Sequence, residues 1–471
     1  MKRVLLFLLI ILSISKITVL TSGCANIIPP AGGPKDSLPP VLEKANPGDS
    51  TRNFTGNKIT FSFNEFVELQ NAQQSLIISP VPKTFPVVEY KLNTVTVKMK
   101  DTLENNTTYS LNFGDAIKDF TEGNVLKNFT YVFSTGPYID SLELKGNVIL
   151  AESGKIDTTL IVMLHTSPDD SAVVKEQPRY FTKLDSKGQF NFKNLPPKKF
   201  YVYALKDDGG SHRYYDKKLL FAFADKPVTT GSNSEPVTLY AYTGKPAAGN
   251  TSTAPISLRN KLRGNADDKR LRYRTNLSGN VQDLLKDFVM TFEDSLKRFD
   301  SLKIRLYSDS TFAPLSSYRF EKDSTGKNYT LYYKWKDNTQ YHLIMDKEFA
   351  EDTTGKKLLK TDTLSFQTKK LSDYGSLKLR FKNIDLSLNP VLLIMSGETI
   401  YKSYPMTGLE INEALFTPGD YDLRMLYDKN KNGKWDPGEF FGKHRQPEMV
   451  KPVDKKISVK SSFQNEYDIT L

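Results

Sequence analysis

Short stretches in which apolar and polar residues alternate dominate the chain. In its first third they are Lys58–Phe63, Thr94–Lys98, Tyr109–Phe113 and Thr130–Phe133. A period of two places successive side chains on opposite faces of a β-strand. Asn, Gly and Pro residues separate these stretches and favour turns between them. Short strands at this spacing predict a β-sandwich.

The following region has its own arrangement of the same alternation. Leu142–Ile149, Leu160–Leu164, Gly188–Phe192 and Leu195–Ala204 are the apolar-rich stretches, and Pro196-Pro197 interrupts the last of them near its start. This order predicts two strands, then a hairpin, a turn and a further strand. We therefore expect a second β-sandwich after the first.

The second half of the chain repeats the first. Asn338–Tyr341 matches Asn106–Tyr109, and Pro418–Met425 matches Lys198–Ala204. An internal repeat on this scale predicts two pairs of β-sandwiches, with the same order of sandwich types in each pair. Four small domains in tandem are typical of a rod or a clasp, not of one deep catalytic body.

Several motifs in the first sandwich carry a family resemblance. They are Pro39–Leu42, Ile59–Val67, Leu103–Tyr109, Ile117–Asn124 and Phe133–Gly136. Together these motifs resemble the SbsA-type bacterial Ig-like domain over Ser37 to Gly136. The resemblance implies an immunoglobulin-like sandwich of the kind found in S-layer and cell-envelope proteins, and it implies a fold without a reaction.

The second sandwich resembles the transthyretin-like, or prealbumin-like, modules of bacterial surface proteins. The resemblance lies in the Gly188–Phe192 hairpin and the strand that follows Leu195. The fold expected for the whole chain is all-β: tandem β-sandwiches in the order Ig-like, transthyretin-like, Ig-like, transthyretin-like. The expected divisions are 1–23 signal peptide, 24–36 Pro/Gly-rich tether, 37–137 SbsA-type Ig-like domain, 138–243 transthyretin-like sandwich, 244–270 flexible basic linker, 271–370 second Ig-like domain and 371–471 second transthyretin-like sandwich.

The N-terminus has the three parts of a secretory signal peptide. Lys2 and Arg3 are positive, Val4–Ile14 is mostly Leu and Ile, and Gly23 supplies the small residue before cleavage. Cys24, the only cysteine, follows at once, and the junction resembles the lipobox of bacterial lipoproteins. That resemblance implies that Cys24 is lipidated and becomes the N-terminus. The junction departs from the family in having Thr21 where Leu is preferred, and the alternative is an ordinary signal peptide with an incidental cysteine.

Composition limits where the chain acts and what it binds. No second apolar run is long enough to span a membrane, so we expect the mature chain outside the inner membrane, anchored to the outer membrane by acyl chains on its periplasmic face or at the cell surface. The net charge is +11. Export makes nucleic acid an improbable partner. The positive charge, including that of the basic linker, could attract an anionic envelope glycan, lipid headgroups or an acidic protein partner. The alternative is a solvated surface that binds no partner.

One stretch near the C-terminus fits the spacing of a calcium-binding loop. Oxygen donors recur at alternate positions, with Gly433 at the sharp turn. The candidate ligands are Asp428, Asn430, Asn432, the carbonyl of Lys434, Asp436 and Glu439. A strand-like sequence precedes the stretch, so no helical EF-hand is expected, and three lysines oppose a dication. The alternative is a metal-free hairpin loop in which Asp and Asn cap turns.

Asp followed by Ser or Thr recurs far more often than composition predicts. The pattern resembles the O-glycosylation acceptor of some Gram-negative envelope proteins. Candidate acceptors are Ser37, Thr102, Ser141, Ser295 and Thr363. The alternative is that Asp-Ser/Thr opens turns and strands, which an all-β chain contains in quantity.

Catalytic motifs are absent from the sequence. The four histidines are isolated, and Glu65 and Asp294 stand at equivalent strand ends without a visible partner. We therefore expect a non-enzymatic lipid-anchored envelope protein with a structural or binding role, such as that of an accessory subunit of an outer-membrane or surface assembly. The alternative is a glycan-binding or adhesive lipoprotein, which predicts exposed aromatic side chains on one face of a transthyretin-like module. A glycan-directed hydrolase is the remote alternative.

Overall fold

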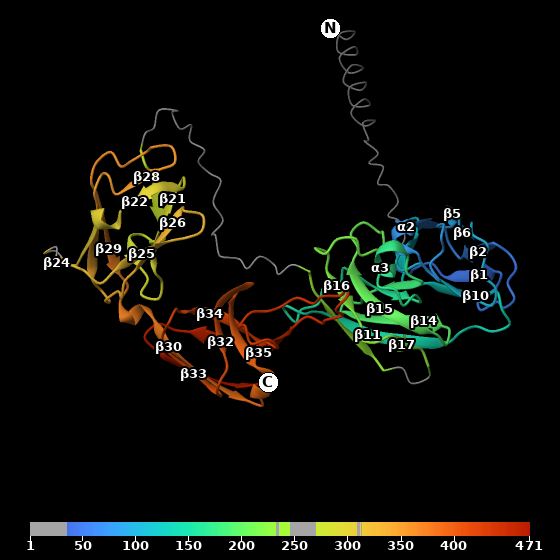
Figure 1. Cartoon of the computed structure of the whole chain (residues 1–471). Coiled ribbons are helices and arrows are strands. Elements are labelled where there is room, and N and C mark those ends of the chain that lie inside the picture. The colour runs from blue at the N-terminus through green and yellow to red at the C-terminus, as the bar shows by residue number, and fades with distance from the viewer. Residues whose placement is uncertain (1–34, 232–234, 245–269, 309–310, 312) are drawn as a thin grey trace, which may run out of the picture. The chain divides into compact units, whose positions relative to one another are not determined.

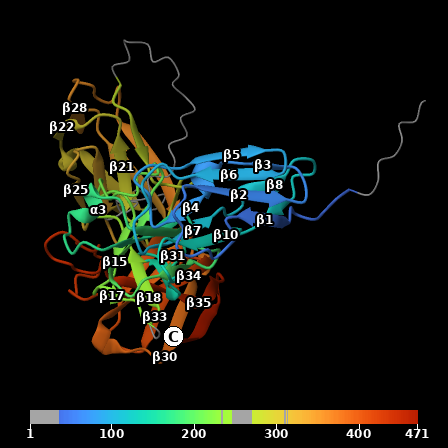
Figure 2. The ribbon, with the colours of Figure 1, turned by 90° about the vertical axis from the view of Figure 1, so that its right-hand side faces the viewer.

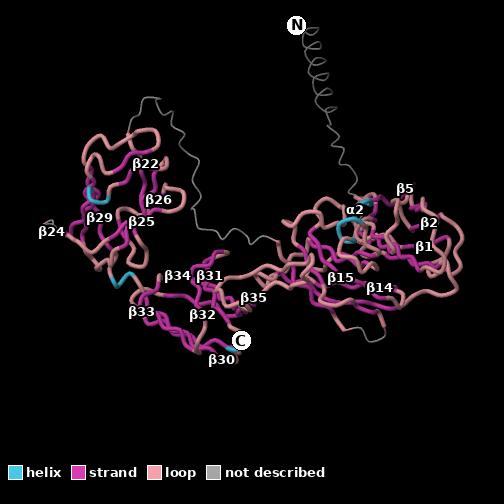
Figure 3. The backbone as a smooth tube through the Cα atoms, in the orientation of Figure 1, coloured by secondary structure: helices cyan, strands magenta, loops and turns pink. Residues whose placement is uncertain are grey.

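The computed structural model describes residues 35–231, 235–244, 270–308, 311 and 313–471. The predicted signal peptide, Cys24, most of the tether and most of the 244–270 linker lie outside these residues. β-Strands make up nearly all of the regular structure (Figure 3), and the all-β prediction is confirmed. The short helical turns are α2 (Ala72–Ser75), α3 (Ala172–Lys175), η1 (Ser301–Lys303), η2 (Leu371–Asp373) and η3 (Leu386–Leu388). Among the described residues, no helix has the length and apolar character needed to cross a membrane.

The chain divides into two compact units, one ending at Ser141 and the other comprising Leu142–Leu471. In the first unit, three sheets surround an aromatic core that includes Phe61, Phe113 and Phe133. The alternation of Lys58–Phe63 places Phe61 and Phe63 on the buried face. The strands, in sheet order, are β1 (Leu42–Asn46), β2 (Lys58–Phe63), β6 (Thr94–Lys98) and β5 (Val87–Lys91); β10 (Thr130–Ser134), β7 (Thr108–Asn112) and β4 (Ile77–Ser79); and β3 (Val67–Leu69), β8 (Ile117–Asp119) and β9 (Val125–Leu126).

A buried carboxylate holds the loop that follows β8. Asp119 accepts hydrogen bonds from the backbone N–H groups of Glu122, Gly123 and Asn124 at 2.5–2.9 Å. Burial alone would raise the pKa of Asp119, but these hydrogen bonds outweigh burial and hold the pKa below its ordinary value. The Ile117–Asn124 motif is thus explained by loop closure.

The second unit begins with the 142–243 module, whose two sheets are seen in Figure 1. Strand β11 pairs in parallel with β18, so the last strand of the module lies beside its first. The strands, in sheet order, are β14 (Gln189–Leu195), β11 (Leu142–Leu150) and β18 (Val237–Ala241); and β13 (Tyr180–Lys183), β12 (Leu160–His165), β15 (Lys199–Lys206) and β16 (Phe221–Phe223), with β17 (Val228–Thr229) also paired to β15.

The 371–471 module repeats this topology, with one long strand, β35, in the place of β16 and β17. Its first strand, β30, also pairs in parallel with its last strand, β36. The repeated sequence stretches Lys198–Ala204 and Pro418–Met425 fall on the equivalent central strands β15 and β34. The strands, in sheet order, are β33 (Glu410–Phe416), β30 (Gly375–Lys382) and β36 (Gln464–Thr470); and β32 (Thr399–Pro405), β31 (Pro390–Ser396), β34 (Gly419–Tyr427) and β35 (Met449–Val459).

The 270–370 module, between these two, repeats the strand pairing of the first unit. The Tyr341 hydroxyl accepts from Lys336 N–H at 3.1 Å, just as the Tyr109 hydroxyl accepts from Glu104 N–H at 2.8 Å. A tyrosine hydroxyl therefore accepts from the backbone N–H five residues earlier in both modules. The strands, in sheet order, are β19 (Tyr273–Thr275), β21 (Phe288–Phe292), β26 (Asn328–Tyr332) and β25 (Arg319–Lys322); β20 (Val281–Gln282), β29 (Asp362–Thr368), β27 (Gln340–Met345), β23 (Ile304–Ser308) and β24 (Ala313–Pro314); and β22 (Leu296–Phe299) and β28 (Ala350–Asp352).

Candidate functional site

The loop between β34 and β35, which contains the predicted calcium ligands, is the most elaborate connection in the 371–471 module. The Asp428 carboxylate is buried and accepts hydrogen bonds from Lys431 N–H at 2.7 Å and Gly433 N–H at 2.6 Å. Asp207, at the equivalent place after β15, accepts in the same way from Ser211 and His212. The shared feature of the two loops is therefore a carboxylate that caps backbone N–H groups.

Glu439, the twelfth position of the predicted calcium loop, lies in a separate part of the connection. Its backbone pairs with Arg445 through two hydrogen bonds of 2.8 Å, and its carboxylate is 3.0 Å from Lys443 Nζ. The chain reverses between these residues, at Gly442, whose φ is 76°. Glu448 then returns to the loop. Its carboxylate accepts from Lys429 N–H at 2.7 Å and Asp436 N–H at 3.1 Å.

The predicted donor set is therefore arranged to hold the loop's own backbone. Asn430 and Asn432 donate through their side-chain amides to the Asp436 carboxylate, and Lys434 N–H donates to Asn432 Oδ1. Burial raises the pKa of Glu448, and the neighbouring Asp428 and Asp436 raise it further. Within the described ranges, no group of three or more His, Cys, Asp or Glu side chains could hold a metal ion. Glu439 thus lies apart from the other predicted donors, which hydrogen-bond within the loop, and calcium binding stays a prediction.

Calcium binding is tested by thermal unfolding with excess calcium and with a chelator. A bound ion raises the unfolding midpoint, because a ligand that binds only the folded state stabilises it. Asp436→Asn is the matched variant, since it removes charge while leaving the backbone contacts of Asp428 and Glu448 in place. An equal midpoint in calcium and chelator contradicts the calcium prediction.

The same connection joins the 371–471 module to the 142–243 module. Phe440 is 4% exposed and lies edge-on or tilted against Tyr203, Phe221 and Phe223, with ring centroids 5.1–5.6 Å apart. These rings belong to β15 and β16. Aromatic pairs in such geometry contribute beyond the apolar area that they bury. Phe440 thus lies in the core of the 142–243 module, although the strands on either side of its loop, β34 and β35, belong to the 371–471 module.

Polar contacts surround this aromatic insertion. His444 Nε2 lies 2.8 Å from an Asp170 carboxylate oxygen. The Gln446 side-chain amide donates to the carbonyl of Phe223 at 2.9 Å, and Val450 N–H donates to the carbonyl of Ala151 at 2.8 Å. Two modules linked through both apolar and backbone contacts pack as one body. We call residues 428–450 the clasp loop.

A cavity of 510 Å³ lies beside the clasp loop, between the same two modules. Its apolar wall includes Leu150, Met395 and Trp435. Arg424 is nearly buried at the cavity and lies 3.0 Å from a Glu398 carboxylate oxygen, and Glu398 also pairs with Lys155. The guanidinium therefore shares the Glu398 carboxylate with the Lys155 ammonium group.

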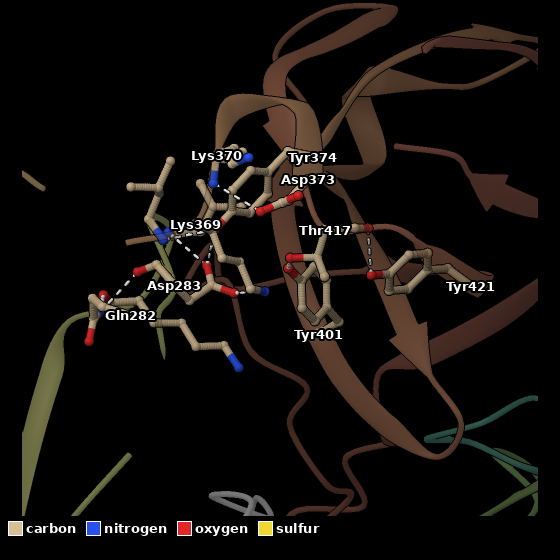
Figure 4. Close-up of polar contacts among 12 residues, drawn as sticks. Gln282, Asp283, Lys369, Lys370, Asp373, Tyr374, Tyr401, Thr417 and Tyr421 are labelled. Atoms are coloured by element: carbon tan, nitrogen blue, oxygen red, sulfur yellow. Dashed lines mark hydrogen bonds and ion pairs between the residues drawn. The ribbon is translucent and has the colours of Figure 1, made fainter. Parts of the chain in front are cut away.

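A second polar joint, shown in Figure 4, links the 270–370 and 371–471 modules. Asp283 is 2.7 Å from Lys369 Nζ and accepts a hydrogen bond from the Tyr374 hydroxyl at 2.8 Å. That hydroxyl in turn accepts from Leu284 N–H. Burial would raise the pKa of Asp283, but Lys369 and the hydrogen bonds hold it below its ordinary value. Burial and the Asp283 contact both raise the pKa of Tyr374.

The four histidines lie at four separate places in the fold, each with its own contacts. His165 on β12 is buried beside Tyr203, and its Nε2 makes no hydrogen bond among the described residues. His212 lies beside Asp207, His342 Nδ1 is 2.8 Å from Ser365 Oγ, and His444 contacts Asp170. Glu65 and Asp294 fall in different compact units.

The buried His165 predicts an acid-sensitive module. Burial lowers its pKa from 6.5 to about 4, so the folded chain keeps it neutral while the unfolded chain takes up a proton. The stabilisation is complete above pH 6.5 and is lost as pH falls towards 4. We expect His165→Phe to reduce the loss of unfolding free energy between pH 7 and pH 4 by up to about 3 kcal/mol. Urea denaturation of both proteins at the two pH values measures this difference, and parallel losses contradict it.

The candidate glycosylation sites lie mainly at the surface. Ser37, Thr102, Ser141 and Thr363 are exposed, whereas Ser295 is half-buried and donates to the carbonyl of Thr325 at 3.1 Å. Several carboxylates of the recurrent Asp-Ser/Thr pattern accept a hydrogen bond from the backbone N–H two residues later, as in Asx-turns. They are Asp36, Asp157, Asp300 and Asp352. Turn capping thus accounts for part of the pattern, and glycosylation stays a prediction.

Sequence reasoning missed the residues that join the modules. Phe440 and Phe441 follow a polar loop and belong to no alternating stretch, and this isolation was the available signal. Glu448 carried no signal, because its position relative to Asp428 depends on the reversal at Gly442. Asp283 and Tyr374 are distant in sequence and meet only in the folded chain.

Comparison with known proteins identifies one domain. Residues 36–135 match the family model of a bacterial Ig-like domain, which confirms the Ig-like fold predicted there. None of the curated proteins matches the chain.

Solved structures that align with the chain are distant. The N-terminal part of the bacterial S-layer protein SbsC is 17% identical, with 43% of this chain and 44% of that chain covered and a TM-score of 0.17. BcpA, the major pilin subunit of Bacillus cereus, is 9% identical, with 70% and 98% covered and a TM-score of 0.17. An L,D-transpeptidase from Mycobacterium smegmatis is 14% identical, with 35% and 76% covered and a TM-score of 0.16.

Proposed function

We propose that this chain is a lipid-anchored protein of the bacterial cell envelope with a structural, non-enzymatic role. In this proposal Cys24 carries the acyl chains that hold it at the outer membrane. The first and third modules are SbsA-type Ig-like domains, and the second and fourth are transthyretin-like. An accessory subunit of a surface assembly, in contact with a protein partner or an envelope glycan, is the role that suits such a chain.

The structural role is supported chiefly by the contacts of the clasp loop, which lie within the loop itself and with a neighbouring module. Loops on a rigid β-scaffold are where binding and catalytic groups usually gather. Here the clasp loop directs the carboxylates of Asp428 and Glu448 to its own backbone and the Phe440 ring into a neighbouring module. The joint of Asp283, Lys369 and Tyr374 likewise holds modules together. The chemistry of these residues supports cohesion of the chain.

The distribution of aromatic side chains supports a structural role over a glycan-binding one. Glycan-binding surfaces expose aromatic rings on which sugars stack. In the described part of Leu142–Leu471, the strongly exposed aromatic residues are Tyr215 and Phe463, and they belong to different modules. Trp335 and Trp435 instead pack against hydrophobic clusters.

The anchor is tested by the intact mass of the protein purified from its native membrane. We expect the mass of the chain from Cys24 plus acyl groups, and mild base is expected to remove the ester-linked part. Sugar-sized increments beyond the lipid are expected if the Asp-Ser/Thr acceptors are modified. The Cys24→Ala variant is the control and should leave the membrane fraction. An unlipidated chain that begins at another residue contradicts the proposal.

A further inference from the structure

Five exposed apolar side chains gather at one end of the first unit. They are Leu38, Val41, Phe66, Leu92 and Phe120, and we call them the apolar tip. Phe66 is 57% exposed and Phe120 is 65% exposed. Single exposed apolar residues are ordinary, but a contiguous group marks a surface that contacts something apolar.

Backbone hydrogen bonds show that these residues are neighbours. Phe120 N–H donates to the carbonyl of Phe66 at 2.9 Å, and Val67 N–H donates to the carbonyl of Leu92 at 3.0 Å. Val41 N–H donates to Asn64 Oδ1 at 2.7 Å, which fixes the leading segment beside Phe66. The tip is therefore built from the ends of β1, β3 and β8 and from the turn between β5 and β6.

The chain enters the first unit at this same end. Figure 2 shows the leading segment leaving the module beyond β1, on the side where β3 and β8 lie. The Asn124 side-chain amide donates to the carbonyl of Asp36, which ties that segment to the loop after Phe120. Cys24 precedes Lys35 by eleven residues, and eleven residues span at most about 40 Å. Whatever surface holds Cys24 therefore lies within reach of the tip.

We infer that the apolar tip docks onto the phospholipid surface in which the Cys24 acyl chains are anchored, with Phe66 and Phe120 inserted at the headgroup boundary. This inference rests on the proposed lipid anchor. The anchor supplies the attachment, and the tip sets which end of the first unit faces the bilayer. Because the tether keeps the local concentration of lipid high, a weak contact suffices.

Charges of both signs lie around the tip. Burial, and then the nearby carboxylates of Asp119, Asp36 and Glu122, raise the pKa of Glu65. Lys118 is paired with Glu68 at 2.6 Å, and the exposed Lys35 and Lys91 adjoin Asp36 and Leu92 in the chain. The contact therefore rests on the apolar side chains, and we expect it to form on a zwitterionic phospholipid surface.

A tryptophan reporter tests the inference in the full lipidated chain. Phe120→Trp is reconstituted on phosphatidylcholine vesicles that carry brominated acyl chains, which quench only nearby tryptophan. We expect the emission of the added tryptophan to shift to the blue. Brominated lipid should quench a larger fraction of the emission of Phe120→Trp than of the parent, whose tryptophans are Trp335 and Trp435. Phe463→Trp is the matched control, because Phe463 is 62% exposed but lies in the other compact unit.

Vesicle flotation separates failure of this inference from failure of the anchor. If Phe120→Trp floats with the vesicles but its added tryptophan stays unquenched, the docking inference is overturned while the anchor stands. If the protein does not float and its mass includes no acyl group, the anchor proposal fails and the docking inference falls with it. Quenching of Phe463→Trp equal to that of Phe120→Trp also overturns a specific role for the tip.

Discussion

Replacing Phe440 with Ala is expected to lower the free energy of unfolding of the Leu142–Leu471 unit by about 3–5 kcal/mol. The ring is nearly fully buried among Tyr203, Phe221 and Phe223, and truncation leaves a cavity between two modules that each have a core of their own. Because those cores remain, we expect the modules to separate before either unfolds. Urea denaturation followed by tryptophan fluorescence, to which Trp435 of the clasp loop contributes together with Trp335, measures the loss.

The control for this prediction is Phe463→Ala. Phe463 is the same residue type but is mostly exposed, so its truncation should change the free energy by no more than about 0.5 kcal/mol. Limited proteolysis supplies a second readout, because Phe440→Ala should be cut in the clasp loop sooner than the parent. Equal denaturation curves for Phe440→Ala and the parent would show that the two modules are not energetically coupled.

The second large effect is expected from Asp428→Ala, which should lower the free energy of unfolding by about 2–4 kcal/mol. The substitution removes the buried carboxylate that accepts hydrogen bonds from the N–H groups of Lys431 and Gly433, and a hydrogen bond to a charged group contributes about 1.5–3 kcal/mol. Relief of repulsion with Glu448 offsets a part of this loss. Lys431 has a φ of 62°, so the loop relaxes once the carboxylate no longer holds it.

Asp454→Ala is the matched control, because Asp454 is exposed on β35 of the same module. Asp428→Asn should fall between the two, since an amide keeps one acceptor oxygen. Thermal unfolding of the three variants in chelator measures the hydrogen-bonding role without any contribution from calcium. Equal midpoints for Asp428→Ala and Asp454→Ala contradict that role.

The sequence predicted the strands well because their signal is local. The alternation in Lys58–Phe63 depends only on which face of one strand is buried, and β2 occupies those residues. The repeat of Lys198–Ala204 at Pro418–Met425 located two central strands for the same reason. Such patterns need no knowledge of what lies on the far side of the sheet.

The candidate site was harder to predict because its contacts are not local. The calcium spacing counted forward from Asp428 to Glu439, but the reversal at Gly442 places Glu448 against the loop instead. Phe440 has its partners on β15 and β16, more than two hundred residues earlier. A period or a spacing rule carries no information about which surface will meet a given side chain.

The clasp loop also has a mechanical consequence. Since the clasp loop binds the 142–243 module to the 371–471 module, the chain between Gly244 and Tyr374 leaves one module and returns to another that is already bound to it. A pulling force applied between Leu142 and the C-terminus therefore passes across the contacts of Phe440, Gln446 and Val450. The 270–370 module is shielded from that tension until those contacts break, and it then adds its own length to the chain. The protein would respond to load first as a stiff connector and afterwards as an extensible one.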